Sequence, residues 1–375
     1  MIKVFMLCSG LGHTQRGYES FFRECFDILS NDSSLDITLF KGCGNREEKE
    51  IPLWNIPYYS WLAVQLGKLT KRGSYGPFVV EQFSFFLNLL PHLQYNQPNV
   101  IYFSEDYLGN WLNRWRRLTQ QNYKLLLRNG GATSPPYHHL DSVQHINPTQ
   151  VQRALRYGEP VDKQKLLPSG FHIPFDLQIL TTSERESLRR KLRLPDKQPL
   201  VLSVAAINKY HKRMDYIIQE VARLPTPRPY LLLLGQQDLE SAEILKLGNQ
   251  VLGTDNFQIR TVPRNQVDDY YKIADIFALA SLREGLPRVL VEAMSYGLPC
   301  LVHDYEITRY ILGEQGYFAD LQLPGNLASL ISQVVVKGFP WSKRYHQHRS
   351  AYERFSWKQL HLKYVEMIKS CAMAS

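Results

Sequence analysis

The chain has 375 residues, of which 44% are hydrophobic and 21% are charged, and its formal net charge is +9. This composition is typical of a globular protein and excludes an intrinsically disordered one, and the length predicts two domains. The positive charge is spread along the chain, without a long basic run or an aromatic-basic module. It fits a phosphate-rich ligand, an acidic membrane surface or an ordinary solvated surface better than nucleic acid, and we expect no nucleic-acid partner.

The cysteines and the apolar segments indicate the compartment. Five cysteines are scattered without a CxxC pair, which predicts reduced thiols and neither a disulfide framework nor a zinc site. The apolar run at residues 1–8 is too short for a signal peptide, and no stretch approaches the about 18 apolar residues of a membrane-spanning helix. We therefore expect a soluble cytoplasmic protein with, at most, a peripheral membrane contact.

Short apolar strands alternate with amphipathic helices through the first half, a pattern that predicts a parallel α/β sheet. The expected strands are residues 3–9, 36–40, 99–103 and 124–127. The first helix is expected at 17–30, because its apolar residues recur on one face. The region 54–93 is rich in aromatic residues and less regular, and its second part, 79–93, is expected to be helical.

The same alternation is clearer in the second half. The expected strands are residues 200–205, 230–234, 257–262, 276–280 and 300–303. The expected helices are 213–224, 240–247, 266–273 and 287–296. A charged helical stretch at 183–193 and a Pro-rich turn at 195–199 place the domain boundary near 175–198, and helices are expected after Pro340.

The strongest indication of a ligand site is the stretch 281–294, which directly follows the expected strand 276–280. Its turn carries Glu284 and Gly285, and Pro287 suits the first position of a helix, where its missing N–H costs nothing. Open α/β sheets bind ligands at the carboxyl ends of their strands, so we expect a site in this turn.

The start of the helix that follows this turn suits an anion. The N–H groups of Arg288 and Val289 and the positive end of the helix dipole fit a diphosphate, and Gly285 lets that backbone come close. Glu284 would point toward the group attached to the distal phosphate, and Glu292 would lie further along the helix. Two ordinary alternatives stay open: Glu284 caps the helix, and Glu292 is a surface charge.

Several ordered segments resemble one known family. The Glu-x7-Glu pair lies in REGLPRVLVEAMSYGLP, which is similar to the signature of retaining glycosyltransferases of the group 1, family-4 type. The segments ADIFALASLREGLP, LLPSGFHIPFD and FSWKQLHLKYVEMI resemble the same family, in the same order. The resemblance implies a GT-B fold, with two facing Rossmann-like domains. Residues 1–180 would bind the acceptor, 181–355 the nucleotide sugar, and 356–375 would form a closing helix on the N-terminal domain.

The resemblance also implies roles for residues of the second domain. Glu284 would hold hydroxyls of the donor sugar, Glu292 the nucleotide ribose and Lys212 the diphosphate. Ala206 occupies the position where the family has an Arg that also holds the diphosphate. Lys209 or Arg288 could supply the missing charge, and the sequence does not decide between them. An alternative is that Lys209, Lys212 and Arg213 form a solvated helix start, where cations are disfavoured without an anion nearby.

Residues of the first domain are assigned in the same way. The loop 9–17 lacks the dinucleotide spacing GxGxxG, but the family brings this loop to the donor, so Gly12 is expected to contact it, with Glu19 just inside the next helix. Asn129 takes the place of a family His that touches the donor sugar. The expected catalytic residues are thus Glu284, Lys212 and Asn129. The expected donor-binding residues are Gly12, Lys209, Lys212, Glu284, Gly285, Leu286, Pro287, Arg288, Val289 and Glu292.

No catalytic metal is expected, because the chain has no Asp-x-Asp motif, and His138, His139 and His145 are interpreted as surface loop residues. The resemblance therefore implies a retaining, metal-independent hexosyltransferase. It would move a sugar from a nucleotide-diphosphate sugar, its substrate and not a cofactor, to a glycan, lipid or small molecule. The alternatives are a nucleotide-sugar-binding protein without catalysis and a nucleotide-sugar epimerase of the same fold.

Overall fold

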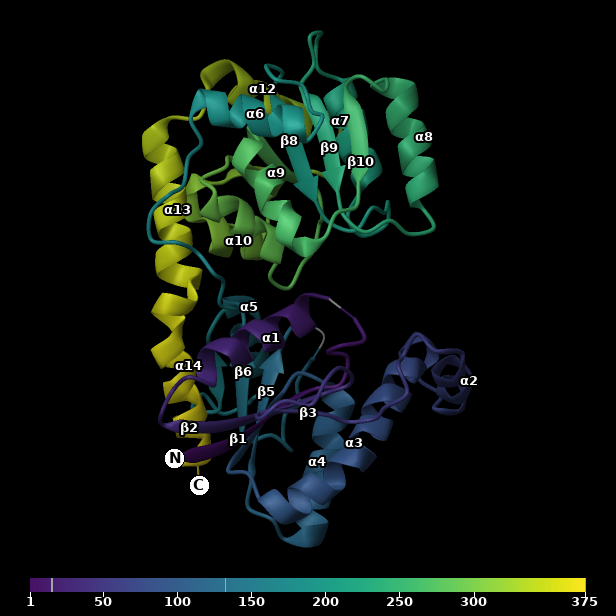
Figure 1. The fold of residues 1–375 in the computed structure, drawn as a ribbon, viewed down its shortest axis with the longest axis vertical. Coiled ribbons are helices and arrows are strands. Elements are labelled where there is room, and N and C mark those ends of the chain that lie inside the picture. Colours follow the sequence, from purple (N-terminus) through teal and green to yellow (C-terminus); the bar gives the residue numbers. More distant parts are fainter. Residues whose placement is uncertain (15, 132, 375) are drawn as a thin grey trace. The chain divides into compact units, whose positions relative to one another are not determined.

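The computed structural model describes residues 1–375 except for 15, 132 and 375. It divides the chain into two compact units (Figure 1). Unit 1 comprises Met1–His172 and Ser356–Ser375, so both ends of the chain belong to it, and unit 2 is the continuous segment Ile173–Phe355. Each unit contains one parallel sheet with helices packed against it.

The sheet of unit 1 has the strand order β3-β2-β1-β4-β5-β6-β7, and all its strands are parallel. The strands are β1 (Ile2–Cys8), β2 (Leu35–Lys41), β3 (Glu50–Pro52), β4 (Val100–Phe103), β5 (Lys124–Asn129), β6 (Ser142–His145) and β7 (Gln164–Leu166). The helices of the unit are α1 (Gly17–Leu29), α2 (Trp61–Leu69), the short 3-10 helix η1 (Gly73–Tyr75), α3 (Gly76–Asn96), α4 (Asp106–Thr119), α5 (Pro148–Arg156) and α14 (Trp357–Ala372).

Alternating side chains of β1 explain why helices cover both faces of this sheet. Val4, Met6 and Cys8 pack in a core with α1 and α14, whereas Phe5 and Leu7 pack in a second core with α3, α4 and α5. A strand that is apolar on both faces needs a helical layer on each, as in other parallel sheets. The last helix of the chain, α14, is therefore part of the core of unit 1.

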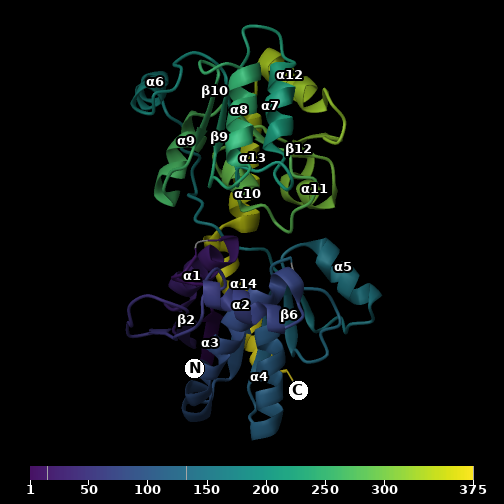
Figure 2. The ribbon, with the colours of Figure 1, turned by 90° about the vertical axis from the view of Figure 1, so that its right-hand side faces the viewer.

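The sheet of unit 2 has the order β10-β9-β8-β11-β12-β13 and is also parallel throughout. Its strands are β8 (Leu200–Val204), β9 (Tyr230–Leu234), β10 (Phe257–Arg260), β11 (Ile276–Leu279), β12 (Cys300–His303) and β13 (Tyr317–Ala319). Its helices are α6 (Thr182–Lys191), α7 (Met214–Ala222), α8 (Ser241–Val251), η2 (Arg264–Gln266), α9 (Val267–Ile273), α10 (Arg288–Ser295), α11 (Glu306–Leu312), η3 (Gly313–Gln315), α12 (Asn326–Lys337) and α13 (Trp341–Phe355). Helices α7 and α8 lie side by side (Figure 2) and share a core with α12 and the strands.

Some elements were not expected from the sequence. Among them are the strands β3, β6, β7 and β13 and the helix α2, which are all short. The strand β6 also consists mostly of polar residues. Gln144 in β6 is nevertheless fully buried, because its amide accepts a hydrogen bond from Tyr102 and donates to Leu167 O (2.7 Å) and Tyr364 Oη (2.9 Å). His145 lies in the same strand, so the interpretation of His145 as a surface loop residue was wrong.

Candidate functional site

The strand order of unit 2 reverses between β8 and β11. The chain builds outward from β8 to β10, returns to β11 and builds outward again to β13. At such a reversal the connections that follow the two central strands lead in opposite directions, and a crevice opens at their carboxyl ends. Lys212 lies in the connection after β8, and Glu284 lies in the connection after β11.

These two residues form an ion pair at that reversal. The Lys212 ammonium donates a hydrogen bond to Oε1 of Glu284, and the two side chains are only 18% and 12% exposed. The Lys212 backbone is held as well, because its N–H donates to Oδ1 of Asn208 at 2.9 Å. A pair shielded from water in this way is stronger than an exposed one. The predicted phosphate anchor and the predicted sugar-binding carboxylate therefore lie together.

The helix α10 begins next to this pair. Pro287 is its N-cap residue in an extended conformation (ψ 104°), so the helix starts at Arg288 and Val289, one residue later than predicted. Leu286 and Gly285 precede it in the same turn. The cap residue makes no side-chain hydrogen bond to the first turn, and the positive end of the dipole of α10 lies at this start.

Glu292 lies in α10 and is not a solvated surface charge, contrary to one of the alternatives above. Its side chain is 12% exposed, and it accepts hydrogen bonds from Nη2 of Arg264 (2.8 Å) and from the Tyr271 hydroxyl (3.1 Å). Its charge is thus held in place, as a ribose-binding carboxylate would need. That role for Glu292 stays a prediction.

Lys209 is placed differently from Lys212. Its ammonium pairs with Glu243 of α8, where both side chains are more than a third exposed, and its N–H donates to Glu240 (2.6 Å). The charge of Lys209 is therefore already compensated on its own side of the loop.

A cavity of about 640 Å³ opens at the same edge of the sheet of unit 2. Its walls come from the connections after β8, β11, β12 and β13, and they are Tyr210, His211, Arg213, Leu282, Arg283, His303, Tyr305 and Gln322. Burial, and then the nearby charge of Glu284, raise the pKa of the Tyr305 phenol. The sequence analysis missed Arg283, His303 and Tyr305. His303 ends β12, and Arg283 and Tyr305 follow β11 and β12. This place at the carboxyl ends of buried strands was a signal that could have indicated them.

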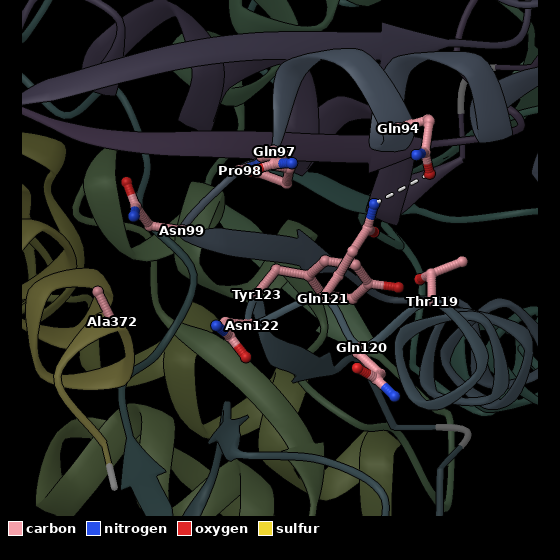
Figure 3. Close-up of a pocket in the computed structure, with 10 residues that line it drawn as sticks. All are labelled: Gln94, Gln97, Pro98, Asn99, Thr119, Gln120, Gln121, Asn122, Tyr123 and Ala372. Carbon is pink, nitrogen blue, oxygen red and sulfur yellow. Dashed lines mark hydrogen bonds between the residues drawn. The ribbon is translucent and has the colours of Figure 1, made fainter.

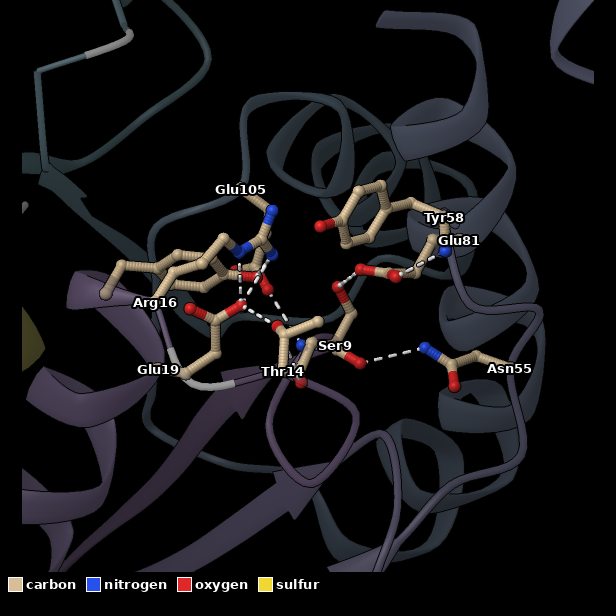
Figure 4. Close-up of polar contacts among 10 residues, drawn as sticks. Ser9, Thr14, Arg16, Glu19, Asn55, Tyr58, Glu81 and Glu105 are labelled. Atoms are coloured by element: carbon tan, nitrogen blue, oxygen red, sulfur yellow. Dashed lines mark hydrogen bonds and ion pairs between the residues drawn. The ribbon is translucent and has the colours of Figure 1, made fainter. Parts of the chain in front are cut away.

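Unit 1 has a reversal of its own, between β1 and β4, and buried carboxylates surround it (Figure 4). Ser9 follows β1, and its N–H donates to Oε1 of Glu105 (2.8 Å) while its hydroxyl donates to Oε1 of Glu81 (3.1 Å). The Ser9 carbonyl accepts from Asn55 (2.9 Å), and the second Glu81 oxygen accepts from the N–H of Tyr58 (2.8 Å). The loop after β1 is thus tied to α3 and to the end of β4.

The next part of the loop centres on Glu19 in α1. This buried carboxylate accepts hydrogen bonds from Nε of Arg16 (2.9 Å) and from the Thr14 hydroxyl (2.6 Å). The Arg16 guanidinium lies over the rings of Tyr58 (4.6 Å) and Phe78 (5.4 Å), which gives it cation–π contacts as well. Glu19 therefore neutralises Arg16 and shapes the loop.

Gly12 lies in this loop with a φ of +93°, and a Cβ there would lie 2.3 Å from the Cys43 carbonyl oxygen. The loop thus needs glycine for its own backbone and for its approach to Cys43, whether or not a ligand binds. The structure places Gly12 at the carboxyl end of β1. The contact of Gly12 with a donor stays a prediction.

Asn129, at the end of β5, is buried, and its amide is used within unit 1. Its Nδ2 donates to the Thr133 carbonyl (3.0 Å) and lies 3.1 Å from the Tyr137 hydroxyl, and its Oδ1 accepts from the N–H of Gly131 (3.1 Å). These bonds hold the loop after β5 in shape. They favour a positioning role, and the predicted catalytic role is untested.

The three histidines do not lie together as a set of metal ligands. His145 is buried in β6 and its Nε2 lies 2.7 Å from Oε1 of Gln164, and burial lowers the pKa of His139. Among the residues that the structure describes, no group of three or more His, Cys, Asp or Glu side chains is placed to hold a metal ion.

A second cavity, of about 320 Å³, lies in unit 1 at the amino-terminal ends of β4 and β5 (Figure 3). Its lining includes the amides of Gln94, Asn99 and Gln121, and Gln121 donates to Gln94 across it (3.5 Å). This is the edge of the sheet opposite to Ser9, and no lining residue carries a charge. The candidate site is therefore not there.

Comparison with known proteins agrees with this geometry. Residues 184–353 match the family model described as glycosyl transferases group 1. A curated relative, the amylovoran biosynthesis glycosyltransferase AmsD of Erwinia amylovora, is 27% identical over 37% of this chain and 39% of its own length. The chain spans half or less of the length of the first curated relatives that it matches.

Solved structures match the fold over nearly the whole chain. A sucrose-phosphate synthase of Thermosynechococcus elongatus is similar with a TM-score of 0.80 at 16% identity, covering 100% of both chains. Anabaena HepE in complex with UDP and glucose is similar with a TM-score of 0.72 at 14% identity, covering 99% of this chain and 100% of HepE. Two parallel Rossmann-like sheets and a last helix that returns to the first unit are thus the GT-B fold.

The segment 184–353, which is most of unit 2, belongs to the group 1 glycosyltransferase family. The predicted family and the predicted α/β fold are confirmed. The family segment includes Lys209, Lys212, Glu284 and Glu292, whose individual roles no comparison tests.

The buried carboxylates of unit 1 have a consequence for stability. Burial raises the pKa of Glu105 from 4.5 to about 7, although the N–H groups of Ser9 and Ser104 oppose it, and the Glu81 charge raises it further. The folded unit thus binds more protons than the unfolded chain between these two pH values. Its stability must fall as the pH rises through that window.

We expect the Glu105→Gln variant to lose much of this pH dependence, because glutamine does not titrate. The free energy of unfolding of the wild type should decrease between about pH 5 and pH 8 by up to about 3 kcal/mol more than that of the variant. Denaturant unfolding at several pH values measures this difference, with the exposed Glu48→Gln as the control. Parallel pH curves for the wild type and Glu105→Gln would show that Glu105 is ionised throughout.

Proposed function

We propose that the protein is a retaining, metal-independent hexosyltransferase that moves a sugar from a nucleotide-diphosphate sugar to a glycan, lipid or small-molecule acceptor. The observation that carries the proposal is the shielded ion pair of Lys212 and Glu284 beside the start of α10. The pair supports the proposal because a cation, which suits phosphates, and a carboxylate, which suits sugar hydroxyls, lie together at the strand reversal of the segment that matches the group 1 glycosyltransferase model.

The ion pair gives the site a way to respond to its donor. A diphosphate at the start of α10 would draw the Lys212 ammonium away from Glu284, because two phosphates carry more charge than one carboxylate. The N–H groups of Arg288 and Val289 would hold the same phosphates, and Gly285, Leu286 and Pro287 would form the turn around them. Glu284 would then be able to accept hydrogen bonds from the sugar.

These residues would position the substrates and stabilise the charge that develops during transfer. As the bond between the anomeric carbon and the phosphate oxygen breaks, negative charge grows on the leaving diphosphate, and Lys212 neutralises it. Glu284 fixes the sugar so that the acceptor oxygen attacks from the face that the phosphate leaves, which retains the anomeric configuration. Glu292 would hold the ribose, and Gly12, Asn129 and Lys209 would complete the donor contacts.

The donor screen should begin with uridine nucleotides, because the similar Anabaena HepE was determined with UDP and glucose. The test incubates the full chain with nucleotide sugars and candidate acceptors, and follows nucleoside diphosphate, the donor sugar and the glycosylated product. Release of diphosphate together with a product of retained configuration supports the proposal. An altered donor sugar would indicate an epimerase, and binding without turnover would indicate a binding protein.

We also propose a cytoplasmic location with a peripheral membrane contact. Four of the five cysteines are buried free thiols, which agrees with a reducing compartment. In the described part of the chain, none of the helices combines the length and the apolar character that crossing a bilayer needs.

The Glu284→Gln variant should lose nearly all transfer while keeping its nucleotide affinity. Glutamine removes the charge that positions the sugar, and it releases Lys212 for the phosphates, so the nucleoside diphosphate should bind as tightly as before or tighter. Steady-state kinetics and calorimetry measure the two effects, with Glu353→Gln, which breaks an exposed pair with Arg349, as the control. Activity within about threefold of wild type would remove Glu284 from the site.

The Lys212→Ala variant should weaken turnover and nucleoside diphosphate binding together. A charge-assisted contact of this kind is worth roughly 1.5–3 kcal/mol, or about ten- to a hundredfold in affinity. Nucleoside monophosphate should lose less, because it lacks the distal phosphate. Calorimetry with both nucleotides measures this, with the exposed Lys337→Ala as the control. An unchanged diphosphate affinity would assign the anchor to Lys209 or Arg288.

Chelation should leave the transfer rate unchanged, because helix N–H groups and Lys212 are the proposed phosphate anchors. The assay compares the rate with and without EDTA, and then after each divalent metal is added back. A loss of activity in EDTA that a single metal restores would contradict the metal-independent mechanism.

A further inference from the structure

The helix α2 packs against the rest of unit 1 through its small residues. Ala63 and Gly67 are the buried residues of this helix. Gly67 meets the start of α3 so closely that a Cβ on it would lie 2.6 Å from the Pro77 nitrogen. Two helical segments approach this closely only where side chains are absent, so the inner face of α2 is its small-residue face.

The outer face of α2 carries large apolar side chains. Trp61 is 74% exposed and Leu69 is 77% exposed, and Leu62, Val64 and Leu66 are exposed too. A surface helix normally turns such residues toward the core and polar residues toward water. Figure 1 shows α2 at the far end of α3, away from the sheet of unit 1. We call these five residues, with the exposed Tyr59 and Tyr75 that flank them, the α2 surface.

The chain segment that contains the α2 surface carries charges of one sign. The segment 51–80 contains three cations and no Asp or Glu. Lys68 lies in the last turn of α2, Lys71 and Arg72 follow it, and all three are exposed. An apolar face with Trp and Tyr at its margins and cations at one end matches the layers of an anionic bilayer surface, where acyl chains lie beneath negative headgroups.

We propose that the α2 surface docks on an anionic lipid membrane, with Trp61, Leu62, Val64, Leu66 and Leu69 in the interface and Lys68, Lys71 and Arg72 on the headgroups. The nine residues of α2 are too few to span a bilayer, so the helix lies in the plane of the surface. A two-fold contact between two α2 surfaces is disfavoured, since the segment 51–80 of the second copy has no Asp or Glu to pair with these three cations. The α2 surface thus supplies the residues for the peripheral contact proposed above.

The test measures vesicle binding of the purified full chain. It compares cosedimentation with vesicles of phosphatidylcholine alone and vesicles that also contain phosphatidylglycerol, at low and at high salt. The wild type should bind the phosphatidylglycerol vesicles at low salt, and much less in the three other conditions. This readout is separate from sugar transfer, so a lack of vesicle binding would overturn the membrane contact and leave the proposed transferase activity standing.

Two sets of variants assign the contact to the α2 surface. The double variant Trp61→Ser/Leu69→Ser and the triple variant Lys68→Gln/Lys71→Gln/Arg72→Gln should each lower the partition coefficient by more than about tenfold. The matched controls change exposed residues elsewhere and should bind like the wild type: Leu118→Ser/Leu239→Ser for the apolar set, and Lys197→Gln/Lys246→Gln/Lys337→Gln for the charges. All the substituted residues are exposed, and circular dichroism checks that each variant folds.

Three results would overturn the proposal. The first is a wild type that does not bind the phosphatidylglycerol vesicles. The second is equal binding of the wild type and the Trp61→Ser/Leu69→Ser variant. The third is a concentration-dependent dimer that this variant abolishes, without any vesicle binding, which would assign the α2 surface to a second copy of the chain.

Discussion

The ion pair of Lys212 and Glu284 exists because the sheet of unit 2 is built outward in two directions from its centre. After β10 the chain of unit 2 returns to the centre and starts again at β11, so two connections that are 72 residues apart in sequence meet at one edge. Each connection contributes one charged side chain. The strand order of unit 2 therefore brings the two connections together, and the residue types then determine the charges at the site.

Unit 1 has the same topological feature and a different chemistry. At its reversal the buried groups are Glu81 and Glu105, with the Ser9 backbone between them, and the nearest described cation in Figure 4, Arg16, is bound to Glu19 and covered by aromatic rings. Carboxylates and hydrogen-bonded loops suit neutral hydroxyl-bearing ligands better than phosphates. The two sheets thus share an architecture, but each of them suits a different kind of ligand.

The predictable parts of the fold are those whose residue pattern can be recognised within one short segment of the sequence. The strands β9 and β11 are unbroken apolar runs, β1 is apolar from Val4 to Cys8, and the turn with Glu284 carries its own glycine and proline. The strand β6 was not predictable, because the partners that make Gln144 acceptable in a core, Tyr102, Leu167 and Tyr364, are 42, 23 and 220 residues away. For the same reason Tyr305 was missed: its place beside Glu284 depends on the order of the strands, which no local pattern contains.

The position of α14 determines when each unit can be completed during synthesis. Tyr364 and Trp357 pack on the Phe21 ring, with ring centres 6.1 and 6.0 Å away, and Ile368 is buried in the same core. A ribosome therefore releases all of unit 2, one uninterrupted segment, before the residues that close unit 1 have been made. Until then the part of α1 that packs on α14 has no cover, and a nascent chain of this protein should need a chaperone most for the half that is translated first.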